Sequence, residues 1–119
     1  MIRLLLVDDH AIVREGLRTL LGETPDLDLA GEAADGPSAV AMATALQPDV
    51  ILLDLMLPGM NGIEVARRIL AKQPACRIIM LTSFADDQNV LEAIQAGAAG
   101  YLLKDVHTKS RCSVNAANS

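Results

Sequence analysis

The sequence predicts an α/β fold in which helices cover both faces of a parallel β-sheet. Short aliphatic runs alternate with amphipathic helical patterns from the first residues onward. Most of these runs are almost continuously apolar, which is typical of strands buried on both faces. The resulting order of elements, β-α-β-α-β-α-β-α-β, favours parallel strands joined by helical crossovers.

Five segments have the length and composition of strands. The second of them, Leu27–Ala30, alternates between apolar and polar residues, which predicts an edge strand with only one buried face. The others are apolar runs that fit the interior of the sheet. The expected strands are Ile2–Val7, Leu27–Ala30, Val50–Leu53, Ile78–Leu81 and Tyr101–Leu103.

Four helices are expected in the gaps between these strands. Asn61 is a favourable N-cap for the third helix, and Gly97 can end the fourth in the left-handed conformation. The expected spans are His10–Leu21, Pro37–Leu46, Asn61–Lys72 and Asp86–Ala96. The residues spaced for a buried stripe include Val13, Leu17, Leu20 and Leu21 in the first helix and Val90, Leu91 and Ile94 in the fourth.

The composition fits one globular domain and excludes several classes of protein. Apolar residues make up 51% of the 119 residues, which excludes a disordered chain. Ten Lys+Arg against fifteen Asp+Glu give a net charge of −5, and there are only two aromatic residues, so nucleic-acid binding is not expected. No apolar run is long enough to span a membrane. Cys76 and Cys112 lack the spacing of a metal or redox site, which favours a reduced, cytoplasmic protein.

Polar side chains directly follow four of the expected strands. Asp8 and Asp9 follow the first, Asp54 the third, Thr82 the fourth and Lys104 the fifth. Three of these features have a plain structural explanation: the acidic pair can be a turn or a helix cap, Thr82 a hydrogen-bonded hydroxyl at a strand end, and Lys104 a solvated surface charge. Asp54 is harder to explain in this way, because an ionised carboxylate within an apolar run is costly unless it has a partner. Because ligands bind beyond the carboxyl ends of parallel strands, their convergence at one edge favours a functional site.

Three neighbouring carboxylates point to a divalent cation. At about 4 Å they repel one another by several kcal/mol per pair, so the group needs a positive charge. Oxygen ligands select Mg²⁺, which keeps coordination positions for a phosphoryl oxygen. A carboxylate can itself be a nucleophile that forms an acyl phosphate. The added negative charge would be stabilised by the metal, by an ammonium group such as Lys104 and by a hydroxyl such as Thr82.

These features occur within four longer motifs. They are Leu5-Leu6-Val7-Asp8-Asp9-His10, Asp54-Leu55-Met56-Leu57-Pro58-Gly59-Met60-Asn61-Gly62, Leu81-Thr82-Ser83 and Gly100-Tyr101-Leu102-Leu103-Lys104. Through them the chain resembles the receiver domain of bacterial two-component response regulators, from Ile2 to about Lys104. The segment Val13-Arg14-Glu15-Gly16-Leu17 after Asp9-His10 is similar to the subfamily with a LuxR-type helix-turn-helix output.

The resemblance implies a flavodoxin-like, doubly wound five-stranded parallel sheet with strand order 2-1-3-4-5. It also implies a phosphorylation-dependent signalling switch, not an enzyme, that accepts a phosphoryl group from a sensor histidine kinase onto Asp54. Asp8, Asp9 and Asp54 would hold Mg²⁺ together with the backbone carbonyl of Met56. In a longer parent protein the switch would control transcription through a DNA-binding domain.

Three further residues take switch or phosphoryl-binding roles by the same resemblance. Thr82 corresponds to the hydroxyl that moves onto the phosphoryl group, and Lys104 to the lysine that pairs with it. Tyr101 corresponds to the aromatic residue whose rotamer changes with the switch. Bulky Met56 and Phe84, two residues beyond Asp54 and Thr82, are expected to hinder water and slow hydrolysis of the phosphoryl group.

The C-terminal residues depart from the pattern. Residues 106–119 are polar, rich in Ser and Asn, and lack an apolar stripe, so the fifth helix is expected to be missing or incomplete, with at most a short helical turn. We expect a receiver domain over residues 1–105 and an atypical tail over 106–119, truncated or altered, with no output domain. The sheet face left open would favour a homodimer or an exchanged element.

Two other functions compete with the phosphoacceptor hypothesis. One is a phosphorylation-independent interaction module with the same fold. The other is a metal-dependent phosphohydrolase of the haloacid-dehalogenase type, which uses a second acid two residues after its nucleophile. The chain has Met56 at that position, and its side chain cannot transfer a proton.

Overall fold

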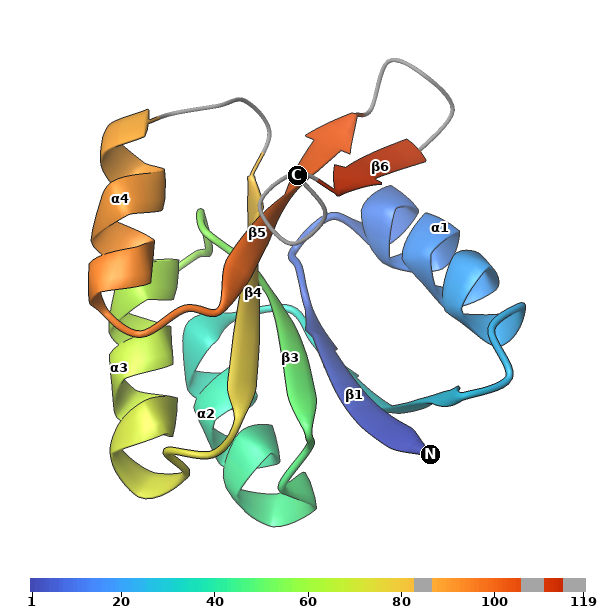
Figure 1. Cartoon of the computed structure of the whole chain (residues 1–119), viewed down its shortest axis with the longest axis horizontal. Coiled ribbons are helices and arrows are strands. Elements are labelled where there is room, and N and C mark those ends of the chain that lie inside the picture. The colour runs from blue at the N-terminus through green and yellow to red at the C-terminus, as the bar shows by residue number, and fades with distance from the viewer. Residues whose placement is uncertain (83–86, 106–110, 115–119) are drawn as a thin grey trace.

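A single six-stranded sheet with the order β2-β1-β3-β4-β5-β6 organises the chain in the computed structural model (Figure 1). The structure describes residues 1–82, 87–105 and 111–114. The strands are β1 Ile2–Val7, β2 Leu27–Ala33, β3 Val50–Asp54, β4 Arg77–Thr82, β5 Gly100–Asp105 and β6 Arg111–Val114. The helices in the described part are α1 Ala11–Gly22, α2 Gly36–Leu46, α3 Gly62–Lys72 and α4 Asp87–Gln95.

The first five strands are parallel and follow the order 2-1-3-4-5. This confirms the flavodoxin-like sheet expected from the sequence, and β2 is the edge strand that its alternating pattern predicted. The direction in which strands are added to the sheet reverses at β1, since β2 pairs with one side of β1 and β3 with the other. Ligand sites in such sheets lie beyond the carboxyl ends of the strands near this point.

A sixth strand in the C-terminal residues was not predicted. Arg111–Val114 pairs antiparallel with β5, where Leu102 lies opposite Val114 and Asp105 opposite Arg111. A strand can form here without an apolar stripe, because its backbone groups bond to the open edge of β5. The expectation of a helical turn at this position is therefore wrong for residues 111–114. The expected boundary between residues 1–105 and 106–119 stays a prediction.

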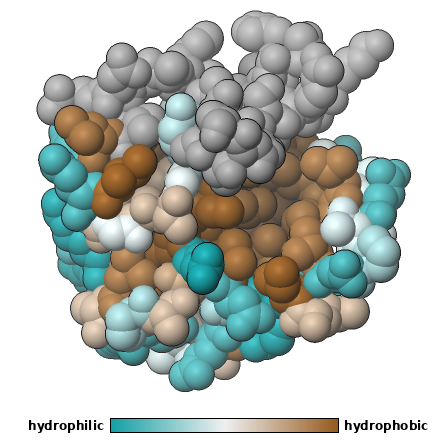
Figure 2. Space-filling model, in the orientation of Figure 1, coloured by the Kyte–Doolittle hydropathy of each residue, from teal (hydrophilic) through white to brown (hydrophobic). Residues whose placement is uncertain are grey.

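Side chains of the central strands alternate between two cores. On one face, Leu5, Ile51 and Ile78 pack with residues of α2, α3 and α4. On the other face, Leu4 and Leu52 pack with α1. Near-continuous apolar strands are therefore explained by burial on both faces. Figure 2, which views the molecule as in Figure 1, shows apolar surface in the region between α1 and α4.

The helix caps follow from local side-chain chemistry. The predicted N-cap of α3 is confirmed, because the Asn61 side chain accepts a hydrogen bond from the Ile63 N–H at 2.7 Å. Asp35 caps α2 in the same way through the Ser38 N–H at 2.8 Å, which holds the pKa of Asp35 below its usual range. Gly97, beyond α4, has φ +113°, as predicted for a left-handed helix end.

The predicted buried stripes are partly wrong. Val13 and Leu17 of α1 are buried, but Leu20 is exposed. In α4, Leu91 and Ile94 are exposed; the side chain of Val90 lies outside the described residues. Among the side chains of α4 that the structure describes, residues 91–95, small Ala93 is the buried one, because it packs closely against the core shared with α3. Among the described residues, no helix is long and apolar enough to cross a membrane.

Candidate functional site

The register of the sheet aligns the carboxyl ends of its central strands. Val7 of β1 lies beside Leu53 of β3, so Asp8 and Asp54 follow at neighbouring positions. Asp54 is in turn paired with Leu81 of β4, one residue before Thr82. The parallel topology thus brings together residues that are far apart in the sequence, as the sequence predicted.

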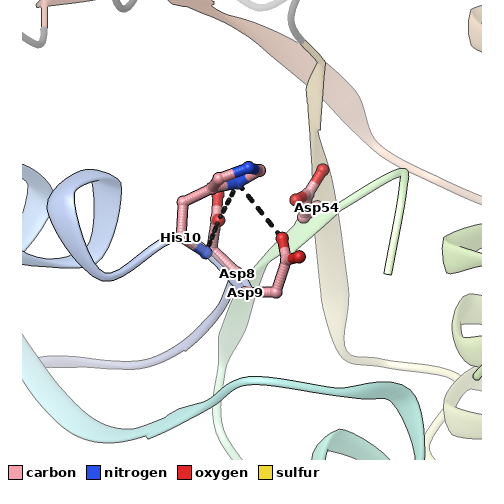
Figure 3. A group of neighbouring side chains, drawn as sticks. All are labelled: Asp8, Asp9, His10 and Asp54. Atoms are coloured by element: carbon pink, nitrogen blue, oxygen red, sulfur yellow. Dashed lines mark hydrogen bonds and ion pairs between the residues drawn. The ribbon is translucent and has the colours of Figure 1, made fainter. Parts of the chain in front are cut away.

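Three carboxylates and one imidazole form a compact group at this edge (Figure 3). Asp8, Asp9, His10 and Asp54 each offer one ligand atom, and these atoms all lie within 4.8 Å of one another. Asp8 and Asp54 are 0% and 2% exposed, whereas Asp9 and His10 face solvent. Two acidic side chains therefore lie in the protein interior, and the group opens outward at Asp9 and His10.

His10 is the member of this group that was not predicted as a site residue. Its backbone N–H donates to Asp8 Oδ1 at 2.8 Å, at the first turn before α1. Its Nδ1 lies 3.2 Å from Asp8 Oδ1 and 3.1 Å from Asp9 Oδ1. The signal was its position directly after the acidic pair, but the sequence alone does not show that the ring folds back onto both carboxylates.

The turn after β3 fixes the Asp54 carboxylate. The backbone N–H of Met56 donates to Asp54 Oδ1 at 3.1 Å. The chain then turns through Gly59, whose φ is +76°, to reach the N-cap Asn61. The side chain of Met56 is 69% exposed, so it projects into solvent instead of entering the core.

The remaining predicted site residues lie on β4 and β5. Thr82, the last residue of β4, is 5% exposed. Tyr101 of β5 is half-buried and packs against the core shared with α2, α3 and α4. The structure places the backbone of Lys104 on β5 one residue beyond Leu103, the partner of Thr82. The side chain of Lys104 and the whole of Phe84 lie outside the described residues.

The donor set fits a hard divalent cation. Mg²⁺ prefers carboxylate oxygens and retains several waters, and three carboxylates here come together with two of them buried. Burying ionised carboxylates is costly without a compensating charge. Asp8, Asp9 and Asp54 are therefore the side chains that would hold the ion, which when bound supplies positive charge for a phosphoryl oxygen.

Comparison with known proteins identifies the family. The family model described as the response regulator receiver domain matches residues 4–113. The chain belongs to this family. The receiver domain is also 51% identical over 104 residues to the transcriptional regulatory protein LiaR of Bacillus subtilis, and 48% identical over 106 residues to the DNA-binding transcriptional activator DevR/DosR of Mycobacterium tuberculosis. These alignments cover 87% and 89% of this chain but 49% of each relative, so the chain spans about half the length of the curated relatives it matches.

Solved receiver structures agree with the fold. A LuxR-family two-component response regulator from Aurantimonas aligns with a TM-score of 0.81 and 42% identity, over 85% of this chain and 72% of that one. The signal receiver domain of the putative response regulator NarL from Mycobacterium tuberculosis aligns with a TM-score of 0.83 and 36% identity, over 92% and 88% of the two chains. The relatives are thus response regulators of the LuxR and NarL type, as the motifs predicted.

Proposed function

We propose that this receiver domain is a Mg²⁺-dependent phosphorylation switch in which Asp54 accepts the phosphoryl group. The observation that supports this most directly is the convergence of Asp8, Asp9 and Asp54 at one edge of the sheet. A carboxylate oxygen of Asp54 attacks phosphorus, and the bond from phosphorus to its donor breaks. With a histidine kinase as donor, a P–N bond is exchanged for an acyl-phosphate P–O bond.

Each surrounding residue has a separate part in this proposal. Asp8 and Asp9 hold the cation together with Asp54 and the backbone carbonyl of Met56. Lys104 neutralises charge on the phosphoryl group, and the Thr82 hydroxyl donates to one of its oxygens. Movement of Thr82 changes the packing around Tyr101, which carries the signal to the surface of α4 and β5.

Intact-protein mass spectrometry tests the phosphoacceptor. We expect the protein incubated with acetyl phosphate and Mg²⁺ to gain about 80 Da, one phosphoryl group on a carboxylate. Omitting Mg²⁺ or replacing the nucleophile (Asp54→Ala) should abolish the gain. A mass gain that persists in Asp54→Ala would place the phosphoryl group elsewhere and contradict the proposal.

The same assay separates the two alternatives. A phosphorylation-independent interaction module would gain no mass although it keeps the fold. A phosphohydrolase would turn over p-nitrophenyl phosphate continuously, and the exposed Met56 offers no group for the acid–base step of that reaction. We therefore expect a single modification event followed by slow loss, and no sustained turnover.

The partners of the whole protein belong to this proposal as well. The receiver domain would act in the cytoplasm, where a sensor histidine kinase would supply the phosphoryl group, and a DNA-binding output domain in a longer parent protein would control transcription. The support is the similarity to LiaR and DevR/DosR, which are described as a transcriptional regulatory protein and a DNA-binding transcriptional activator. The net charge of −5 agrees with DNA binding outside these residues.

Self-association through the α1-side face of the sheet is a further part of the proposal. Val50, Ile79 and Leu102 are only partly buried in the core that α1 covers. Apolar surface of this kind is stabilised by contact with a second copy. Light scattering at high protein concentration should give the mass of a dimer, and a monomer at all concentrations would contradict the expected homodimer.

A further inference from the structure

Arg14 of α1 connects the acidic group to the edge strand β2. Its Nη1 donates a hydrogen bond of 2.6 Å to the backbone carbonyl of Asp8. Its Nε lies 3.4 Å from Glu32 Oε1, on β2. Both the Arg14 and the Glu32 side chains are mostly buried, at 22% and 24% exposed. One guanidinium therefore touches the backbone of a candidate cation ligand on one side and a carboxylate on the other.

Glu32 is itself held by a second arginine. Arg18, one turn after Arg14 on α1, donates through Nε at 2.6 Å to Oε2 and through Nη2 at 2.9 Å to Oε1. This two-point contact, the strongest geometry for an arginine–carboxylate pair, holds the pKa of Glu32 below its usual range. The carboxylate that faces Arg14 is thus ionised at neutral pH and fixed in place.

The hydrogen bond from Arg14 to the Asp8 carbonyl influences where the side chains of Asp8 and Asp9 point. That carbonyl belongs to the peptide unit joining Asp8 to Asp9, and a peptide unit is planar. Fixing its C=O therefore fixes the N–H of Asp9 and limits rotation on either side of the plane. On the other side of the Asp8 Cα, the backbone is set by the sheet, because the Asp8 N–H donates to the Ala33 carbonyl at 3.1 Å.

We propose that Arg14 is a positioning residue for cation binding, and that Glu32 acts through it. The guanidinium holds the Asp8–Asp9 peptide unit so that both carboxylates face Asp54. Glu32 holds the guanidinium on the outer side of this turn, away from the carboxylates with which it would otherwise pair. This inference rests on the proposed function, because it assumes that the acidic group binds Mg²⁺.

Direct calorimetric titration with Mg²⁺ tests the inference. Arg14→Met keeps the apolar stem of the side chain and removes its donors, and we expect an affinity about 10-fold lower, at the low end for loss of an outer-shell contact. Glu32→Gln should lower the affinity by a smaller factor, about threefold. The matched control is Arg68→Met on α3, whose partner is the exposed Glu64 at 3.1 Å, and its Mg²⁺ affinity should equal that of the wild type.

The double variant distinguishes a connected chain of contacts from two separate effects. If Glu32 acts through Arg14, Arg14→Met with Glu32→Gln should bind Mg²⁺ no more weakly than Arg14→Met alone. Urea unfolding of the same variants measures their stability. If the loss of affinity came only from a general loss of structure, it would follow the loss of stability instead of the non-additive pattern. The inference would be overturned if the double variant lost Mg²⁺ affinity by the product of the two single-variant factors. It would also be overturned if the affinity of Arg14→Met lay within twofold of that of the Arg68→Met control.

The outcome also separates this inference from the proposed function. If the wild-type protein binds Mg²⁺ and is phosphorylated, and Arg14→Met binds Mg²⁺ with the same affinity, the proposed function stands and the role of Arg14 is refuted. Wild-type protein that binds no Mg²⁺ would overturn both. If Arg14→Met fails to fold, Glu32→Gln decides the question, and an unchanged affinity in that variant counts against the inference.

Discussion

Gly62, the first residue of α3, lies directly against the backbone of Asp54. A Cβ at this position would come within 2.6 Å of the Asp54 carbonyl oxygen and within 2.9 Å of the Leu55 Cα. The N–H of Gly62 also donates to the Leu55 carbonyl at 2.9 Å. The absence of a side chain at Gly62 therefore allows α3 to begin against the strand that carries the proposed phosphoacceptor.

We predict that Gly62→Ala lowers both stability and phosphorylation. The added methyl group meets backbone atoms that cannot move without shifting Asp54, and such overpacking costs about 1–3 kcal/mol in the free energy of unfolding. Urea denaturation and the acetyl phosphate assay measure the two effects. Gly22→Ala is the control, because nothing lies within 4 Å of a Cβ there, and it should leave both unchanged or slightly stabilise the fold. A Gly62→Ala variant as stable and as active as Gly22→Ala would contradict this prediction.

The exposed side chain of Met56 should lengthen the lifetime of the phosphoryl group. The backbone of Met56 contacts the Asp54 carboxylate, because its N–H donates to Asp54 Oδ1 at 3.1 Å. Replacing its apolar side chain with an amide (Met56→Asn) introduces groups that can orient water, so we expect several-fold faster dephosphorylation. The rate of loss of the mass increment measures this. Leu20→Asn, a similar change at an exposed site near the end of α1, should behave as the wild type. An unchanged or slower rate in Met56→Asn would refute the prediction.

The contacts of His10 with the acidic pair should oppose cation binding. Its Nδ1 lies 3.2 Å from Asp8 Oδ1 and 3.1 Å from Asp9 Oδ1, oxygens that the cation would need. Because the imidazole is mostly exposed, its contacts with the carboxylates contribute up to about 1 kcal/mol, so His10→Ala should bind Mg²⁺ up to about fivefold more tightly. Calorimetry measures the affinity, with His107→Ala, the other histidine of the chain, as the control. Weaker binding by His10→Ala would show instead that the ring assists the cation.

Burial controls the chemistry of the Cys76 thiol. Desolvation, with a smaller contribution from the charge of Asp49, raises its pKa. In a Cys112→Ser background we expect slow reaction of the native protein with a thiol reagent at neutral pH, and fast reaction after denaturation in urea. The unfolded thiol loses its proton near pH 8.5, before the folded one, so Cys76 lowers stability as pH rises above that value. Fast labelling of the native protein at pH 7 would contradict the buried, protonated state.

The parts of the fold that the sequence predicted are those with a strong local signal. Strands buried on both faces appear as continuous apolar runs, and Asn61 stands where an N-cap is needed. The acidic group was also predictable, since parallel strands bring Asp8 and Asp54 to the same edge once the order of elements is known. For these features, local pattern and tertiary structure agree.

Other features depend on contacts that the sequence does not display. Strand β6 forms through backbone pairing to an open edge, which leaves little trace in the side chains. Leu91 and Ile94 have the spacing of a buried stripe, yet packing against α3 selects Ala93. The positions of His10 and Arg14 depend on how α1 crosses the ends of β1 and β2. These are tertiary effects that periodicity alone does not predict.

We propose that Asp54 takes up the phosphoryl group beside a cation held by Asp8 and Asp9. The most direct test is to phosphorylate the protein with acetyl phosphate and Mg²⁺, reduce the acyl phosphate with borohydride and locate the reduced residue by peptide mass mapping. We predict reduction of the side chain at position 54 alone, and none in Asp8→Asn or without Mg²⁺. Label at another position, or equal labelling without the metal, would contradict the account.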